Sequence, residues 1–349
     1  MQLSKYFKNK NVLILGGTGS IGTKILEALI PLSPRIIKIF SRDEYKQHKM
    51  RYKYAGINSI DYNLGDIRDI DSLNAVCRDI DIIFHCAALK HVPISEEMPE
   101  EFIKTNILGS LNVKRAALLN NIPTVISISS DKAVDPSNLM GLSKAVQEKI
   151  FSSHYLKEKR PGVRFINVRF GNVIGSHGSL FPIILYQILN KKPITVTHPE
   201  MTRFYMSQKE AIDLILWSAM YGNDGEIIIK KMKSAKIITI IDRFLRIMKK
   251  SSVWPKRFIG IRIGEKMHES LLTEDNMYKV HERKGYYVVA PYSHRDIKKN
   301  VIEQSRTKYN TEMEKFLSYY QKNFLSLTEI DRYIADFIKE AKIENNNSL

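Results

Sequence analysis

Cysteine and long apolar segments are both scarce in this chain of 349 residues. The two cysteines, Cys77 and Cys86, cannot form a disulfide framework, so we expect a reducing compartment and a cytoplasmic protein. No window reaches the roughly 18 apolar residues that a membrane span needs. The first apolar run, residues 11–15, ends at two glycines, which predicts a strand rather than a signal peptide.

Clusters of positive charge are also missing, although the net charge is +17. A polyanion partner, such as nucleic acid, an anionic membrane surface or a charged nucleotide, would explain this excess. The lysines are nevertheless spread along the chain instead of forming blocks of about five to eight residues, which favours a solvated basic surface. No zinc-finger or RNA-binding motif occurs, so we predict no nucleic-acid partner. The lack of a long apolar window predicts no integral membrane segment.

Short apolar strands alternate with helical patterns in the first half of the chain. We expect strands at residues 11–15, 35–40, 81–85, 124–129 and 164–170, and helices at 20–30 and 100–120. Buried strands separated by helices predict the α/β class, with a Rossmann-type doubly wound parallel sheet. After about residue 171 the alternation loosens, which indicates a smaller, partly discontinuous second lobe.

The last expected element is an amphipathic helix over residues 326–342. Ser326 and Glu329 have the spacing of a capping box at its start. One face carries an apolar stripe of Ile330, Tyr333, Ile334, Phe337 and Ile338. We expect this stripe to dock on the protein rather than on a membrane.

A glycine-rich turn, "LILGGTGSIG", joins the first expected strand to the first expected helix. Its glycines allow a tight turn and let the backbone approach a pyrophosphate at the helix N-terminus. The residues that we expect to contact a dinucleotide here are Gly16, Thr18, Gly19, Ser20, Ile21 and Gly22. A glycine turn without a nucleotide is the alternative, but the position between strand and helix favours the dinucleotide.

The second strand lacks the acidic residue that usually holds the ribose 2′-hydroxyl of NAD. Ser41 and Arg42 stand in its place, with Lys46 one turn further. A hydroxyl and a guanidinium suit a 2′-phosphate, so this strand end predicts NADP. The alternative is that Arg42 is a surface residue and that Asp43 holds the ribose.

The ends of the next two strands fit the rest of a dinucleotide. Asp66 and Ile67 follow the third strand, where they would flank the adenine. Small residues that allow close passage of the cofactor end the fourth strand: Cys86, Ala87 and Ala88. His85 and Cys86 have no further ligands at suitable spacing, so we predict no metal site.

A tyrosine is missing from the stretch "SISSDKAVDPSNLMGLSKA", residues 127–145. In a Tyr-x-x-x-Lys pair the tyrosinate takes a proton as hydride leaves the substrate. Lys144 is present here, but Met140 occupies the tyrosine position. Asp131 and Lys132, an acid and an amine at a strand end, can act instead as proton donor and acceptor. A turn aspartate beside a solvated lysine is the other interpretation.

Further motifs follow in collinear order from residue 11 to about 290, and together they resemble a known family. The chain is similar to the nucleotide-sugar 4,6-dehydratases of the extended short-chain dehydrogenase/reductase superfamily. It resembles most the soluble UDP-N-acetylglucosamine 4,6-dehydratases, polysaccharide biosynthesis proteins, with the 5-inverting type favoured. The matching stretches are "GGTGSIG", "SRDEYKQ", "GDIRD", "AALKHVP", "KTNILGS", "SSDKAVDPSNLMGLSKA", "RFGNVIGSHGS", "MTRFYMS" and "IGIRIGEKMHE".

The resemblance implies roles for individual residues. Ser130, Asp131 and Lys132 match the catalytic Ser/Thr-Asp-Lys triplet of the family, and Lys144 matches the lysine that holds the nicotinamide ribose. Met140 matches members that carry methionine in place of the tyrosine, and we expect it to keep the pocket dry. The implied substrate contacts are Lys90, Asn172, Leu180, Arg203 and Arg262.

The implied reaction oxidises C4 of a UDP-sugar, eliminates water across C5 and C6, and returns the hydride to C6. Asp131 would be the acid at the C6 hydroxyl and would need a raised pKa. Lys132 would be the base at C5, so we expect burial and neighbouring positive charge to lower its pKa from about 10.4 to between about 7 and 8. The base for C4 oxidation stays open between Lys144, a bound water and Lys132.

The expected division has an NADP-binding Rossmann domain at residues 1–175, completed by segments at about 200–240. The substrate-binding lobe comprises residues 176–200 and 250–300, and residues 301–349 form a C-terminal helical extension. The resemblance also implies a homo-oligomer built on dimers, such as a hexamer. Two alternatives are a nucleotide-sugar 4-epimerase, which usually needs the tyrosine, and a non-catalytic NADP-binding regulator, which would lose the catalytic triplet.

Overall fold

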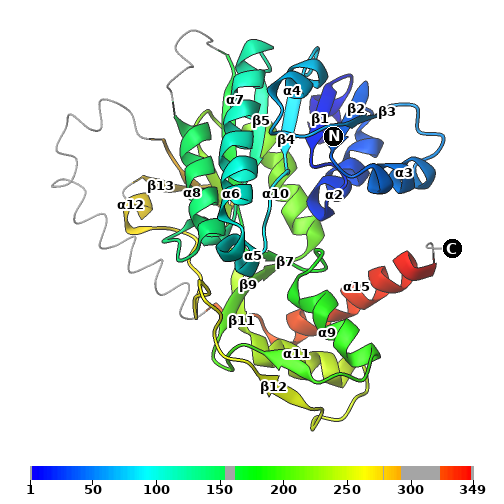
Figure 1. The fold of residues 1–349 in the computed structure, drawn as a ribbon, viewed down its shortest axis with the longest axis vertical. Helices are drawn as coiled ribbons and strands as arrows, with labels where there is room; N and C mark the ends of the chain where they lie inside the picture. Colours follow the sequence, from blue (N-terminus) through cyan, green and yellow to red (C-terminus); the bar gives the residue numbers. More distant parts are fainter. Residues whose placement is uncertain (1, 154–161, 278, 292–322, 347–349) are drawn as a thin grey trace.

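A twisted sheet with helices on both faces forms the upper part of the molecule, and a smaller lobe lies below it (Figure 1). The computed structural model describes residues 2–153, 162–277, 279–291 and 323–346. Within these ranges the large sheet has the order β13-β14-β10-β6-β5-β4-β1-β2-β3. Its strands are β1 (Asn11–Leu15), β2 (Ile36–Ser41), β3 (Ile60–Leu64), β4 (Ile82–His85), β5 (Thr124–Ile128), β6 (Arg164–Arg169), β10 (Ile227–Lys230), β13 (Val280–Arg283) and β14 (Tyr286–Val289).

The neighbouring strands β10, β6, β5, β4, β1, β2 and β3 all run parallel. Strands β14 and β13 extend the sheet in antiparallel pairing. Each strand predicted from the sequence is present within about one residue of its expected bounds. The predicted Rossmann-type α/β class is therefore confirmed. The strand order reverses direction between β1 and β4, and such a switch point is where open parallel sheets bind ligands.

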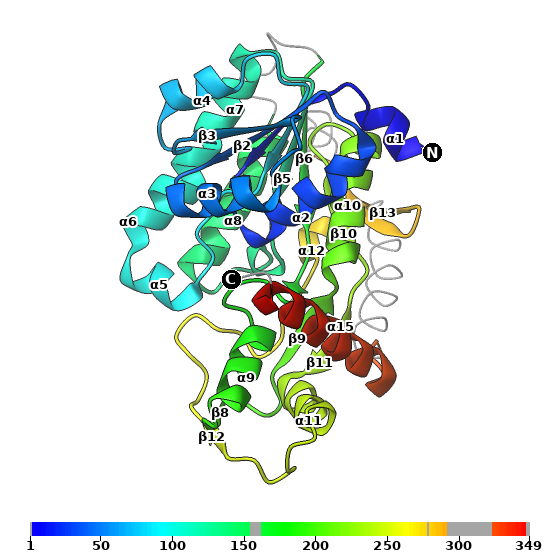
Figure 2. The same ribbon diagram turned by 90° about the vertical axis from the view of Figure 1, so that its right-hand side faces the viewer.

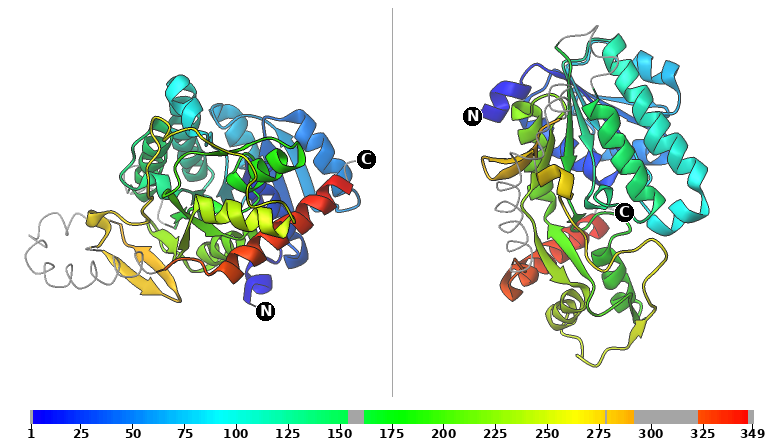
Figure 3. Two further views of the ribbon diagram at one scale, coloured as in Figure 1. Left: turned by 90° about the horizontal axis from the view of Figure 1, so that it is seen from below. Right: turned by 90° about the vertical axis from the view of Figure 1, so that its left-hand side faces the viewer.

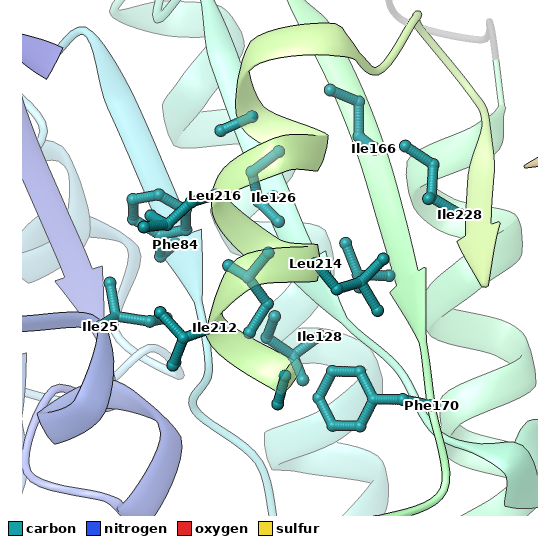
Figure 4. Close-up of a cluster of buried hydrophobic side chains, with 14 of the residues drawn as sticks. Ile25, Phe84, Ile126, Ile128, Ile166, Phe170, Ile212, Leu214, Leu216 and Ile228 are labelled. Carbon is teal, nitrogen blue, oxygen red and sulfur yellow. The ribbon is translucent and has the colours of Figure 1, made fainter. Parts of the chain in front are cut away.

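One face of the sheet is covered by α2 (Ser20–Leu29), α3 (Glu44–Lys53) and α10 (Gln208–Tyr221). Ile25 of α2 and Ile212 of α10 pack against Phe84 and Ile126 of the central strands (Figure 4). The opposite face is covered by α4 (Ile70–Val76), α7 (Gly109–Leu119) and α8 (Leu139–Ser152). Helices on both faces explain why the strands read as continuous apolar runs. Three further short helices are α1 (Gln2–Phe7), α5 (Val92–Glu97) and α12 (Glu274–Met277).

The helix expected at residues 100–120 is not one continuous α-helix. It consists of α6 (Pro99–Phe102), a π-helical turn at Ile103–Leu108, and α7. The amide of Gly109 donates to the carbonyl of Lys104, five residues earlier, as a π-helix requires. Period-based reasoning cannot detect this widened turn, because it changes the register by a single residue.

The lobe has its own small sheets and its own apolar core (Figure 2). Its strands are β7 (Asn172–Val173), β9 (Thr202–Met206) and β11 (Lys233–Lys236) in one sheet, and β8 (Ile194–Val196) and β12 (Lys256–Phe258) in another. Its helices are α9 (Leu180–Leu189), α11 (Ile237–Ile247) and α15 (Leu327–Asn346). Phe181, Phe244 and Phe337 bring one aromatic ring from each helix to the centre of this core.

The final helix, α15, packs along α11 (Figure 3). The Glu329 amide donates to Ser326 Oγ at 3.2 Å, and Glu329 Oε2 accepts from the Ser326 amide at 2.8 Å, so the predicted capping box is confirmed. The predicted stripe faces the lobe core, with Ile330, Tyr333 and Ile334 buried. The described part of the expected extension is thus built into the lobe, whereas residues 292–322 lie outside the described residues.

Within the described ranges, no helix combines the length and the apolar character that crossing a membrane requires.

Truncating the aromatic contact of α15 tests how much this helix contributes. We expect Phe337→Ala to lower the free energy of unfolding by about 3–5 kcal/mol, because the buried ring contacts Phe181 and Phe244 and leaves a cavity when removed. Lys339→Ala, on the exposed face of the same helix, should change it by less than about 0.5 kcal/mol. Urea denaturation measures both values, and equal effects would contradict this packing.

Candidate active site

Two adjoining cavities lie at the carboxyl ends of the parallel strands. The first, of about 620 Å³, extends over the ends of β1, β2 and β3, and the second, of about 490 Å³, reaches from the glycine turn to the lobe. They share Gly16, Gly19, Cys86 and Ala88 in their walls. Together they form an elongated site at the switch point of the sheet, the usual place for a dinucleotide in this architecture.

The glycine turn is as tight as the sequence predicted. Gly16 has a φ of +76°, and a Cβ at this residue would lie 2.7 Å from the amide nitrogen of Ala87. A Cβ at Gly22 would lie 2.5 Å from the carbonyl oxygen of Gly16. Only glycine fits at both positions, so the start of α2 stays close to the ends of β1 and β4. The backbone therefore leaves room for a pyrophosphate at the N-terminus of α2.

Every residue predicted to bind the cofactor lines one of the two cavities. The first cavity is lined by Gly16, Thr18, Gly19, Ser41, Arg42, Lys46, Asp66, Ile67, Cys86, Ala87 and Ala88, and the second adds Ser20, Ile21, Gly22 and Lys144. The residues present thus fit a nicotinamide dinucleotide. Their individual roles stay predictions.

The polar and charged residues at the end of β2 have different hydrogen-bond and ion-pair partners. Asp43 caps α3: its carboxylate accepts from the Lys46 amide at 2.9 Å and pairs with Lys46 Nζ at 2.8 Å. Arg42 is about half exposed and lies 3.5 Å from Asp66. The Ser41 hydroxyl accepts from Gln47 at 3.0 Å. Asp43 thus caps the helix, and both Asp43 and the half-exposed Arg42 line the first cavity.

The triplet at the end of β5 is held together by short hydrogen bonds. The Asp131 amide donates to the carbonyl of Phe170 at 3.0 Å, which joins this turn to the end of β6. Asp131 Oδ1 accepts from Ser130 Oγ at 2.9 Å and from Lys132 Nζ at 3.0 Å. The carboxylate is fully buried, whereas Ser130 and Lys132 line the second cavity. A ligand in that cavity therefore meets the hydroxyl and the amine first.

The expected shift of the Lys132 pKa is wrong in direction. Burial lowers its pKa, but the negative charges of Asp131 and Glu269 outweigh burial, so the net pKa is raised above the ordinary value. Arg203 lowers the pKa and only partly offsets these carboxylates. In the structure the amine is held as an ammonium ion, and a separate proton transfer is needed before it can act as a base.

Sequence reasoning missed Glu269, the second carboxylate at Lys132. Its Oε1 atom lies 3.6 Å from Lys132 Nζ and 3.9 Å from Arg203 Nε. The only sequence signal was its place at the end of "IGIRIGEKMHE", a stretch that matched the family but indicated no acid–base role. The contact arises only when the loop after β12 folds back onto the sheet edge.

Lys144 lies behind the triplet on α8. Its Nζ donates to the carbonyl of Ile128 at 2.8 Å and to Gln147 Oε1 at 2.9 Å. Burial lowers its pKa to about 8, although Cys86 and Glu148 oppose this shift. Met140, one turn earlier, is buried and lines the second cavity as an apolar wall, so this position supplies a thioether instead of a phenol.

Asn106, in the π-helical turn, is a second residue that sequence reasoning missed. Its side chain is buried and bonds both the amide and the carbonyl of Leu89, at 2.8 and 2.9 Å. It also donates to Ser143 Oγ on α8 at 2.9 Å. Asn106 therefore ties the segment before Lys90 to the helix that carries Lys144.

The predicted substrate residues separate into two groups. Lys90 and Asn172 line the second cavity, and Lys90 Nζ donates to the carbonyl of His177 at 2.6 Å. Arg203 is buried on β9 beside Glu269. Leu180 begins α9 and packs against the lobe core, and Arg262 is half exposed beside Glu265. Arg203, Leu180 and Arg262 do not line the two cavities. Their roles as substrate contacts stay predictions.

His85 has a structural environment. Its Nε2 lies 3.0 Å from Ser110 Oγ, and burial, with the nearby charge of Lys144, lowers its pKa to about 3. The imidazole is therefore neutral at physiological pH. Across the described part of the chain, no group of three or more His, Cys, Asp and Glu side chains could hold a metal ion.

Comparison with known proteins assigns a family to this chain. Residues 12–291 match the family described as polysaccharide biosynthesis protein. The chain belongs to that family. A relative from Rickettsia bellii (strain OSU 85-389), named UDP-glucose 4-epimerase, is 39% identical over 321 residues, which cover 87% of this chain and 92% of the relative.

Solved structures agree with this fold. The X-ray structure of Pen from Bacillus thuringiensis has a TM-score of 0.79 at 35% identity and covers 82% of this chain and 90% of Pen. DesIV, a dTDP-glucose 4,6-dehydratase from Streptomyces venezuelae with NAD bound, has a TM-score of 0.70 at 18% identity, covering 86% of this chain and 98% of DesIV. Both structures thus share the Rossmann-like α/β fold of this chain.

The depressed pKa of Lys144 makes a prediction about stability. Between its folded pKa of about 8 and its ordinary value of 10.5, the folded protein binds fewer protons than the unfolded chain. The burial cost of this charge is therefore relieved as the pH rises through that window. The free energy of unfolding of the unmodified protein, minus that of Lys144→Met, should grow by about 3 kcal/mol over this window. Urea denaturation at several pH values measures this difference, and a constant value would contradict the buried charge.

Proposed function

We propose that the protein is an NADP-dependent lyase, a 4,6-dehydratase of UDP-N-acetylglucosamine that serves polysaccharide or glycan biosynthesis. The product would be a UDP-2-acetamido-2,6-dideoxy-hexos-4-ulose, with inversion at C5 as the favoured outcome. The observation that carries this proposal is the hydrogen-bonded pair of Asp131 and Lys132 beside the second cavity. An elimination needs an acid and a base at neighbouring carbons, and this pair supplies one of each.

The bound dinucleotide would supply the hydride acceptor and donor. The protein must supply the proton transfers. One proton passing from Lys132 Nζ to Asp131 Oδ1 across their 3.0 Å hydrogen bond breaks an N–H bond, forms an O–H bond and changes no net charge. This single step yields a neutral amine and a protonated acid together. The raised pKa of Lys132 opposes this transfer, but the proton moves only within the pair and the net charge of the site stays the same.

After this transfer, the neutral Lys132 and the protonated Asp131 act in a fixed order. Lys132 takes the proton from C5 and becomes an ammonium ion, and the proton on Asp131 passes to the C6 hydroxyl, which leaves as water. Ser130 lies between the buried Asp131 and the cavity, so its hydroxyl is placed to relay that proton. The Lys132 ammonium then returns a proton to C5. Return from the opposite face would invert C5.

Met140 is expected to keep this region dry. Its buried side chain carries no proton at any pH, so the C4 hydroxyl must lose its proton to another group. Lys144, whose pKa is about 8, is suited to this role and to the nicotinamide ribose.

The 4-epimerase alternative is favoured by the name of the Rickettsia bellii relative. Epimerases of this fold use a tyrosine as the acid–base group, and methionine stands at that position here. A non-catalytic regulator would have no use for the triplet. Mass spectrometry of the product after incubation with UDP-N-acetylglucosamine separates these functions: dehydration removes one water, epimerisation leaves the mass unchanged, and a regulator leaves the substrate intact.

A homo-oligomer also stays a prediction.

Changing the pair should stop the elimination without emptying the nucleotide site. We expect Asp131→Asn and Lys132→Ala each to lower the rate of dehydration at least about a hundredfold, since each removes one proton-carrying group. Binding of NADP, measured by calorimetry, should persist in both variants. Asp135→Asn, an exposed carboxylate four residues further, serves as the control and should keep full activity. Full activity in either pair variant would remove the pair from the mechanism.

Arg42 should decide the choice of cofactor. We expect the unmodified protein to bind NADP more tightly than NAD, and Arg42→Ala to weaken NADP by roughly tenfold to a hundredfold while NAD changes little, because a charge-assisted phosphate contact is lost. Arg51→Ala, an arginine on α3 that does not line the cavity, is the matched control. Equal affinity of the unmodified protein for both dinucleotides would defeat the assignment.

A further inference from the structure

Glu269 is a buried carboxylate that the mechanism above does not use. Only 4% of its side chain is exposed, and its Oε1 atom lies 3.6 Å from Lys132 Nζ. Its Oε2 atom is buried without a hydrogen-bond partner among the described residues. An unsatisfied buried carboxylate oxygen lowers the free energy of unfolding by about 1–3 kcal/mol or more, so a contribution to stability does not explain why Glu269 is buried here.

The charges around the Lys132 amine come from three separate elements. Asp131 lies on the same turn, Glu269 on the segment after β12, and Arg203 on β9. The Lys132 ammonium ion is therefore shared by Asp131 and Glu269. The Arg203 guanidinium also lies next to Glu269. Asp131 Oδ2 also has no hydrogen-bond partner among the described residues, so both carboxylates depend on Lys132 for much of their compensation.

A buried ion pair fixes the distance between Glu269 and the triplet. Arg169, on β6, donates to Glu148 at 2.9 and 2.6 Å and also to the carbonyl of Leu271 at 2.7 Å, two residues after Glu269. Glu148 accepts in turn from Ser129 Oγ at 2.6 Å, immediately before the triplet. The same network therefore anchors both the turn that carries Lys132 and the segment that carries Glu269.

We propose that Glu269 is a positioning residue that holds the Lys132 amine at the cavity wall as an ammonium ion until the proton passes to Asp131. This inference rests on the proposed function, because it assigns the resting state of the base in that reaction. Glu269 competes with Asp131 for the same ammonium from the lobe side. It would thus keep the amine from acting as a free base or nucleophile toward a carbonyl in the cavity.

The proposal predicts a change in the ionisation of Lys132 that needs no substrate. Glu269→Gln removes one of the two negative charges at the amine, so the pKa of Lys132 should fall by about one unit or more. Glu269→Asp keeps the charge and should keep most of the raised pKa. Glu282→Gln, which removes the acidic partner of a surface Lys–Glu pair formed with Lys231, is the matched control and should leave Lys132 unchanged.

The measurement is competitive acetylation of amines across a range of pH, with the peptide that carries Lys132 quantified by mass spectrometry. Lys132 lines the cavity and keeps 20% of its side chain exposed, so the reagent can reach it. The expected result is a labelling midpoint above the ordinary lysine value of about 10.4 in the unmodified protein and a lower midpoint in Glu269→Gln. An unshifted midpoint in Glu269→Gln would overturn the proposal.

A second arm covers the case in which Glu269→Gln fails to fold. In the unmodified protein alone, a Lys132 midpoint at or below the ordinary lysine value would already overturn the role of Glu269. The dehydration assay is run separately on the same samples. If Glu269→Gln leaves the Lys132 midpoint unchanged while the unmodified protein dehydrates the substrate, only the role of Glu269 is refuted. If Glu269→Gln lowers the midpoint but the unmodified protein shows no dehydration, the proposed function is refuted and the coupling of Glu269 to Lys132 stands.

Discussion

The hydrogen bond between Lys132 and Asp131, at the buried end of β5, is the interaction on which the site depends. A fully buried carboxylate is costly unless a cation accompanies it, so the amine cannot leave without penalty. The surrounding structure is arranged to hold it: the Asp131 amide is bonded to the strand end at Phe170, and Glu269 approaches from the lobe. The sheet edge and the segment after β12 therefore each place a carboxylate at this one amine.

The parts of this site that could be predicted from the sequence are local in the chain. A tight turn at Gly16, the cap of α15 at Ser326 and the apolar strands depend on neighbouring residues, and each produces a periodic or positional signal. The adjacency of Asp131 and Lys132 is local as well, so the sequence alone indicates the pair. Local signals thus determine both the Rossmann-type sheet and the edge at which chemistry is possible.

The parts that could not be predicted depend on contacts between distant segments. The sequence indicates burial around Lys132 and so predicts a lowered pKa, but it gives no sign of the opposing charge of Glu269, which raises the pKa. Glu269 becomes a neighbour only after the loop following β12 returns to the sheet. The lobe strands also pair segments that are far apart in the chain, such as Asn172 with Tyr205, and a two-residue strand such as β7 carries no detectable alternation.

The central claim is that the Lys132 amine carries the proton at C5 during an elimination. Its most direct test is incubation of the unmodified enzyme with UDP-N-acetylglucosamine in D2O, followed by NMR of the product. Because an ammonium ion exchanges its protons with solvent, the account predicts a dehydrated 4-keto sugar with deuterium at C5 and with the original C4 hydrogen at C6. A dehydrated product that keeps its C5 hydrogen, or a C4 epimer formed without loss of water, would contradict it.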